Sequence, residues 1–162
     1  MTVDDPDPLA MVAGVAAHAA ADVLNLRFRL TDSHKRLLFG ASDAVVANSV
    51  MEPFGLVGLE AMAAGGVAVV GTTGEDYANQ ENALRLSSAT AEELALRARA
   101  LVRDPALAQQ LRAAGRRTAR EFVWERILRA TLLPMVVPGR AVSRSDAPDA
   151  VRRSERELTS VA

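Results

Sequence analysis

The sequence predicts an α/β fold in which helices cover both faces of a parallel sheet. The chain has 162 residues, the length of one ordinary domain. Short apolar runs alternate with longer segments of helical character, which is the arrangement of consecutive βα units. Gly, Pro, Asp and Thr stand at the ends of these segments, where turns and helix caps favour them.

The amino-terminal part predicts two helices separated by a strand. Residues 7–25 predict a first helix, which is opened by an Asp-Pro pair. Residues 25–30 alternate polar and apolar side chains with a period of two, which indicates a strand with one covered face. Residues 31–40 predict a short helix that is capped by a Thr-Asp-Ser run and ends at Gly40.

Two buried strands flank a helix in the middle of the chain. Residues 43–47 and 67–70 are compact, Val-rich runs, typical of strands buried in a parallel sheet. The helix between them starts at Pro53 and is terminated by Gly65 and Gly66.

A polar loop over 71–82 leads to another strand over 83–86. Thr90 and Glu93 then have the Thr-x-x-Glu spacing of a capping box, which predicts a helix that reaches residue 103.

The carboxyl-terminal part predicts two more helices and a tail. An Asp-Pro pair opens a helix over 104–122, and a last helix over 124–133 is stopped at Pro134. Trp124 is interpreted as a packing anchor. Residues 138–162 have mixed charge and few large apolar side chains, so we expect a disordered tail.

Composition argues against several classes of function. With 19 basic and 20 acidic side chains the net charge is -1, whereas nucleic-acid binders usually carry a basic surplus, so no nucleic-acid partner is expected. The absence of cysteine excludes disulfides, thiolate nucleophiles and Cys-ligated zinc. Two histidines cannot supply a three-His site, and we expect no metal.

No targeting or transmembrane segment is predicted. Residues 1–8 are acidic and lack the basic start of a secretory signal. The apolar stretch 9–24 is rich in alanine and is interrupted by Gly14, His18 and Asp22, so it is interpreted as a helix of a soluble protein. The expected location is the cytoplasm.

The segment 48–65 is the most informative for function. After a strand, a loop ends in Glu52, and a Pro-Phe-Gly turn then opens a helix that contains Glu60. The first-turn amides of a helix lack intrahelical partners and lie at the positive end of its dipole, so they can bind an anion, and Gly55 lets a diphosphate approach the backbone. Carboxylates on either side suit hydroxylated groups at both ends of the ligand. A nucleotide-sugar has this anatomy.

Glu52 and Glu60 also carry a resemblance to a known family. They have seven residues between them, within Glu-Pro-Phe-Gly-Leu and Leu-Glu-Ala-Met-Ala-Ala-Gly, and resemble the E-x7-E signature of the retaining GT-B glycosyltransferases of family 4. Weaker matches lie in the expected order at residues 41–46, 81–83 and 122–125, so that the resemblance covers about residues 30 to 133. It implies a Rossmann-like parallel sheet that forms a single, incomplete GT-B lobe.

The resemblance also implies a role for each matching residue. Glu52 is the expected catalytic residue and faces the hydroxyls of the donor sugar. The backbone amides of Phe54, Gly55 and Leu56 are expected to hold the diphosphate. Glu60 is expected to bind the ribose hydroxyls. The implied reaction transfers a hexosyl group from a nucleoside-diphosphate sugar with retention, and it requires neither a metal nor another cofactor.

Departures from the family pattern define the expected domains. Residues 1–137 correspond to a C-terminal, donor-binding lobe that is incomplete at its N-terminal side, and 138–162 to the tail. The acceptor-binding lobe and the Arg/Lys pair that neutralises the donor phosphates are missing, since the only lysine, Lys35, lies on the expected helix over 31–40. The chain alone is therefore expected to be inactive or nearly so.

Two questions of partner and function stay open. Either an acceptor-domain protein or a second copy of the chain is expected to cover the apolar side of the last helix, around Trp124, Ile127 and Leu128. The alternative function is a non-catalytic module, from a truncated glycosyltransferase, that binds nucleotide-sugars or proteins. The loop containing Glu75, Asp76 and Tyr77 fits a surface loop and a donor-facing loop equally well.

Overall fold

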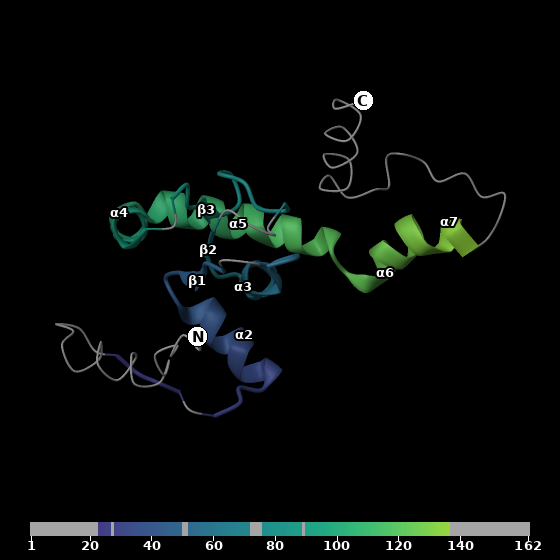
Figure 1. Ribbon diagram of the computed structural model, residues 1–162, viewed down its shortest axis with the longest axis horizontal. Helices are drawn as coiled ribbons and strands as arrows, with labels where there is room; N and C mark the ends of the chain where they lie inside the picture. Colours follow the sequence, from purple (N-terminus) through teal and green to yellow (C-terminus); the bar gives the residue numbers. More distant parts are fainter. Residues whose placement is uncertain (1–22, 27, 50–51, 72–75, 89, 137–162) are drawn as a thin grey trace, which may run out of the picture. The chain divides into compact units, whose positions relative to one another are not determined.

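The computed structural model describes residues 23–26, 28–49, 52–71, 76–88 and 90–136 (Figure 1). The chain divides into two compact units, Met1–Thr31 and Asp32–Ala162. The tail over 138–162 lies outside the described residues, as does most of the helix expected over 7–25.

In the first unit, the described residues form neither a helix nor a strand. The prediction of a helical end at 23–25 is therefore wrong, and so is the prediction of a strand at 25–30. An alternating segment becomes a strand only when a neighbouring backbone pairs with it. The described residues of this segment take no part in the three-stranded sheet, which consists of strands from the second unit.

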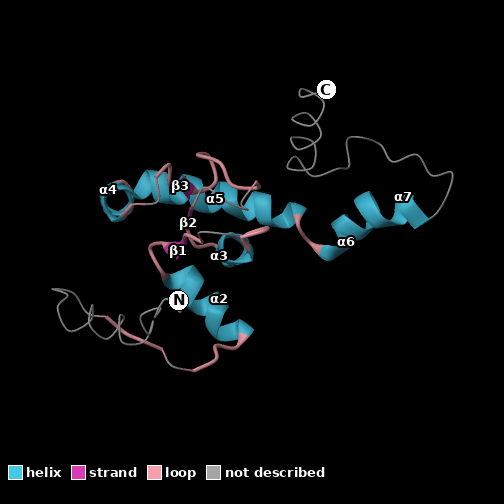
Figure 2. Ribbon diagram, viewed as in Figure 1, coloured by secondary structure: helices cyan, strands magenta, loops and turns pink. Residues whose placement is uncertain are grey.

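The second unit is built on a parallel sheet of three short strands, β1 (Val45–Ala47), β2 (Ala68–Val70) and β3 (Leu84–Arg85) (Figure 2). Their order is β1-β2-β3, with Val46 opposite Val69 and Val70 opposite Arg85. The predicted α/β class, with a parallel sheet flanked by helices, is confirmed.

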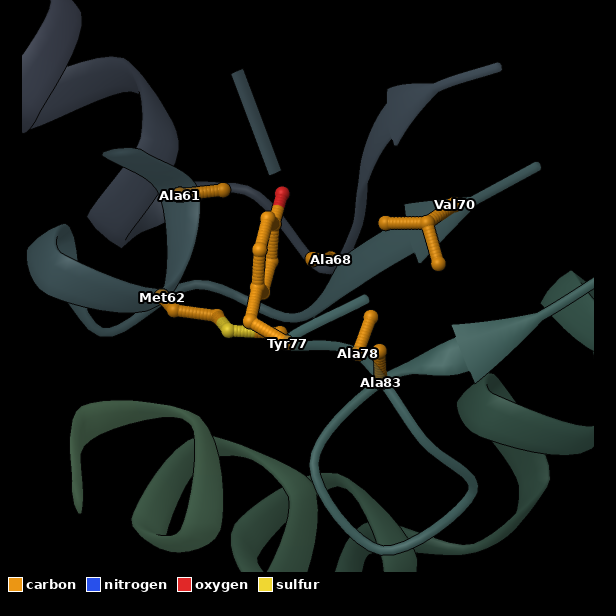
Figure 3. Packing of buried hydrophobic residues seen from close by; sticks show 7 residues of the cluster. All are labelled: Ala61, Met62, Ala68, Val70, Tyr77, Ala78 and Ala83. Carbon is orange, nitrogen blue, oxygen red and sulfur yellow. The ribbon is translucent and has the colours of Figure 1, made fainter. Parts of the chain in front are cut away.

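Side chains of the central strand alternate between two core clusters, because successive residues of a strand point to opposite faces. The first cluster lies against helix α3 (Leu56–Ala64) and is shown in Figure 3; it comprises Ala61, Met62, Ala68, Val70, Tyr77, Ala78 and Ala83. The second lies against helices α4 (Ala91–Arg103) and α5 (Pro105–Glu121), and comprises Val67, Val69, Leu84, Leu86, Leu101 and Leu111. Both faces of the sheet are therefore covered.

Helix α2 (Asp32–Ala41) packs against α3, and a glycine sits at their contact. The expected end at Gly40 is wrong by one residue, because the helix continues through it. A Cβ on Gly40 would lie 3.0 Å from the carbonyl oxygen of Ala64. Gly40 therefore serves the close approach of two helices rather than a left-handed turn.

Helix α4 begins with half of the predicted capping box. The Thr90 hydroxyl accepts a hydrogen bond from the amide of Glu93 at 3.3 Å, as expected. The Glu93 carboxylate, however, accepts from the amides of Ser87 and Ser88 at 2.8–2.9 Å and from the Ser88 hydroxyl, so it caps the preceding loop instead. These bonds, the Ser87 amide first, lower the pKa of Glu93 to about 2.

This carboxylate makes stability depend on pH in the acid range. The depressed pKa stabilises the folded chain above the ordinary value of 4.5, and this stabilisation is lost as the pH falls toward 2. We expect Glu93→Gln to lower the Tm at pH 7, with a difference from the wild type that shrinks between pH 4.5 and pH 2. Thermal melts across this range test it, with Glu92→Gln, which removes the exposed neighbouring carboxylate, as the matched control. A difference that is constant with pH contradicts the expectation.

The last helical segment does not stop at Pro134. It runs from α6 (Trp124–Ile127) through a π-helical stretch, η1 (Leu128–Leu132), into α7 (Leu133–Val136). Pro134 therefore lies inside a continuous helical segment, and the wider π-helical turn directly precedes it. The prediction for Trp124 is also wrong, since 76% of this residue is exposed.

Candidate functional site

The turn before α3 lies where two parallel strands end. Asn48 directly follows β1 and Gly71 directly follows β2. A Cβ on Gly71 would lie 2.6 Å from Oδ1 of Asn48, so the two strand ends are in contact. Ligands of open α/β sheets bind outside these carboxyl ends.

The turn itself depends on Gly55. Its φ of 74° and ψ of 52° lie in the left-handed region, which a right-handed helix cannot contain. Helix α3 therefore begins at Leu56, three residues later than Pro53 had indicated. No side chain caps the amides of its first turn, and Leu56 is 60% exposed. Val57 is exposed as well, whereas Gly55 and Gly58 are buried, so an anion can approach this turn from the side of Leu56 and Val57.

Phe54 of this turn belongs to an aromatic cluster, in which its ring packs against those of Tyr77 and Phe122. The ring centroids are 5.6 to 5.8 Å apart and the rings are tilted or edge-on. The Tyr77 hydroxyl donates a hydrogen bond to the carbonyl oxygen of Gly55. Tyr77 is only 4% exposed, so the reading of its loop as a plain surface loop is wrong for this residue.

Glu52 lies in the irregular segment between β1 and α3 and is half-buried. Glu60 lies on α3 with its side chain 44% exposed. The two predicted carboxylates therefore stand on either side of the turn along the chain, one before it and one a little more than a helical turn after Leu56.

The structure brings a residue without an assigned role, Lys35, to Glu60. Its Nζ lies 3.1 Å from both carboxylate oxygens of Glu60 and 3.4 Å from Oδ1 of Asp32. The hydrogen bond to Glu60 raises the pKa of Lys35 above its usual value. Lys35 and Glu60 are 25 residues apart and meet only because α2 packs against α3, so no local sequence pattern could have paired them.

A pocket of about 360 Å³ opens between α2 and α3 beside this ion pair. Two cationic and two anionic side chains give its lining no net formal charge; the lining residues are Asp32, Lys35, Arg36, Phe39, Glu60, Ala63 and Ala64. Glu60 thus lines a pocket whose other charged side chains all come from α2.

A second pocket, of about 330 Å³, lies between the loop after β2 and α5. It shares Tyr77 and Phe122 with the aromatic cluster and is otherwise mostly polar, with Asp76, Asn79, Glu81, Asn82, Ala114, Arg117, Thr118 and Glu121 in its lining. Asn82 at its base is 5% exposed and holds the loop through three hydrogen bonds.

Comparisons with known proteins identify the family of the chain. Residues 15–118 match the family model of the glycosyl transferases group 1. Over 98 residues the chain is 39% identical to the glycogen synthases of two Mycobacterium tuberculosis strains, CDC 1551 / Oshkosh and ATCC 25618 / H37Rv, an alignment that covers 58% of this chain and 24% of each relative. The chain thus spans about a quarter of the length of these curated relatives.

The solved structure of sucrose-phosphate synthase from Thermosynechococcus elongatus is also similar to the chain. It matches with a TM-score of 0.52 and 26% sequence identity over 78% of this chain and 28% of that one. In the part of the chain that the structure describes, no helix is long and apolar enough to cross a membrane.

Proposed function

Because the chain belongs to the group 1 glycosyl transferases, which have the GT-B type of fold, we propose that its residues 1–137 are a donor-binding lobe for a nucleoside-diphosphate sugar. One observation carries this proposal: the uncapped first turn of α3, opened by the left-handed Gly55 at the ends of β1 and β2. Fixed backbone donors at a helix start suit a diphosphate.

The proposed roles follow the order of groups in such a ligand. The amides of Phe54, Gly55 and Leu56 hold the diphosphate. Glu52, before the turn, is the catalytic residue and contacts the sugar, and Glu60, after it, accepts hydrogen bonds from the ribose. The half-exposed carboxylate of Glu60 and the pocket beside it support this assignment.

The proposed reaction is that of family 4: transfer of a hexosyl group with retention and without a metal. Charge grows on the leaving diphosphate as its bond to the sugar breaks, and preorganised donors stabilise that charge without reorganising. The acceptor-binding lobe and the phosphate-neutralising cations would come from a segment or partner other than these residues. The chain by itself would then bind the donor but transfer little or nothing.

Isothermal titration with UDP, GDP, ADP and their sugars tests the proposal. We expect a dissociation constant in the micromolar to millimolar range for one of them, and Glu60→Ala to weaken it about 10- to 100-fold, the worth of a hydrogen bond to a charged group. Glu92→Ala removes an exposed carboxylate on α4 and is the control that changes net charge equally. No binding by any member of the panel would favour the non-catalytic module that binds proteins instead.

A partner for the last helical segment remains a prediction. Between Val123 and Val136, seven large apolar residues are between 40% and 78% exposed: Val123, Trp124, Leu128, Leu132, Leu133, Met135 and Val136. This exposure supports self-association or an acceptor-domain partner at that side. Light scattering tests self-association, and a monomer at high concentration excludes it.

A further inference from the structure

The direction of one amide in the proposed diphosphate turn is held in part by a residue from another loop. Gly55 is the N-cap of α3, so its carbonyl accepts the first hydrogen bond of the helix, and a second donor to the same oxygen holds this peptide unit more firmly. The carbonyl of Gly55 and the N–H of Leu56 belong to the same planar peptide and point in opposite directions. A group that holds this carbonyl therefore also aims the Leu56 amide.

The Tyr77 hydroxyl is that group, since it donates to the carbonyl oxygen of Gly55. Helix α3 leaves room for it: a Cβ on Gly58 would lie 2.6 Å from the Tyr77 hydroxyl oxygen and 3.0 Å from Cγ1 of Val70. A larger residue at position 58 would push the hydroxyl away from the turn.

Tyr77 is itself held on several sides. In Figure 3 its ring spans the first core cluster, with the hydroxyl at the end far from Ala78 and Ala83. The ring packs against Phe54 and Phe122, and its backbone carbonyl accepts a hydrogen bond from Nδ2 of Asn82 at 2.9 Å. A rigid support of this kind is what keeps a binding group in its productive direction.

We infer that Tyr77 is a positioning residue, whose hydroxyl aims the Leu56 amide at the diphosphate of the donor. The inference rests on the proposed function for the identity of the ligand. The loop after β2 would thereby contribute to donor binding through the backbone of Gly55, without contact with the ligand.

NMR of the full chain tests the inference, with Tyr77→Phe as the variant and Phe122→Leu as the control. The control loosens the same aromatic cluster but keeps the hydroxyl. In the free chain, we expect the order parameter of the Leu56 amide to fall from about 0.85 toward 0.6 in Tyr77→Phe and to stay near the wild-type value in Phe122→Leu. With inorganic pyrophosphate as the probe, we expect Tyr77→Phe to weaken binding about tenfold, the worth of roughly 1.4 kcal/mol.

The control separates positioning from stability. A merely structural role would lower pyrophosphate affinity in both variants in proportion to their loss of Tm. An unchanged Leu56 amide in Tyr77→Phe overturns the inference, and so does wild-type pyrophosphate affinity in that variant when the wild type binds. If the wild-type chain binds neither pyrophosphate nor any nucleotide, the proposed function fails and the inference that Tyr77 serves a donor fails with it.

Discussion

Asn82→Ala is expected to lower the free energy of unfolding by about 3 kcal/mol, because it leaves buried backbone groups without partners. Nδ2 of Asn82 donates to the carbonyl of Tyr77 at 2.9 Å and to the hydroxyl of Thr118 at 2.8 Å. Its Oδ1 accepts from the amide of Asn79 at 2.8 Å. Alanine can make none of these hydrogen bonds. Because Asn82 is only 5% exposed, water has little access to the groups that lose their partner.

Chemical denaturation measures this loss, which corresponds to a fall in Tm of roughly 10 °C for a chain of this size. Thr118→Val is the matched control, since it removes one acceptor of Asn82 and keeps the shape of the side chain. We expect it to cost about 1 kcal/mol. Equal effects of the two variants would contradict a role for Asn82 in holding the backbone of the Tyr77 loop.

Gly66→Ala is expected to cost about 2–3 kcal/mol, as overpacking of a tight contact does. Helix α3 ends in a Schellman motif: Gly65 has a φ of 84° and donates to the carbonyl of Met62, and Gly66 donates to that of Ala61. A Cβ on Gly66 would lie 2.3 Å from the carbonyl oxygen of Phe39. Because that atom is backbone, α2 has to move to make room.

The same helix pair supplies the control. In Gly40→Ala, the new Cβ meets the carbonyl oxygen of Ala64 at 3.0 Å, a milder contact. Position 40 is also inside a helix, where alanine is favoured over glycine by about 1 kcal/mol. We expect Gly40→Ala to change the free energy of unfolding by less than half as much as Gly66→Ala in the same denaturation experiment. A larger loss of stability in Gly40→Ala than in Gly66→Ala would contradict the expectation that the shorter Cβ contact, at Gly66, costs more.

The caps and turns were predictable because their chemistry is local. Thr90 and Asp104 cap the helices that their sequence contexts predict, and Gly65 ends α3. Predictions that depended on a neighbour failed. The segment 25–30 alternates like a strand, but its described residues form none. The Glu93 carboxylate accepts from the amides of Ser87 and Ser88 and does not complete the capping box.

For the candidate site, the sequence alone indicated the turn and its two carboxylates, because Glu52, the Pro-Phe-Gly turn and Glu60 all lie within eighteen consecutive residues, 48–65. The residues that contact them were determined by tertiary packing. Lys35 reaches Glu60 from α2, and Tyr77 reaches Gly55 from the loop after β2, over separations of 25 and 22 residues. Helix capping and the backbone conformation of glycine depend on a few neighbouring residues and can be predicted from the sequence. Contacts between distant segments form only when the helices pack against the sheet, so the tertiary structure decides them.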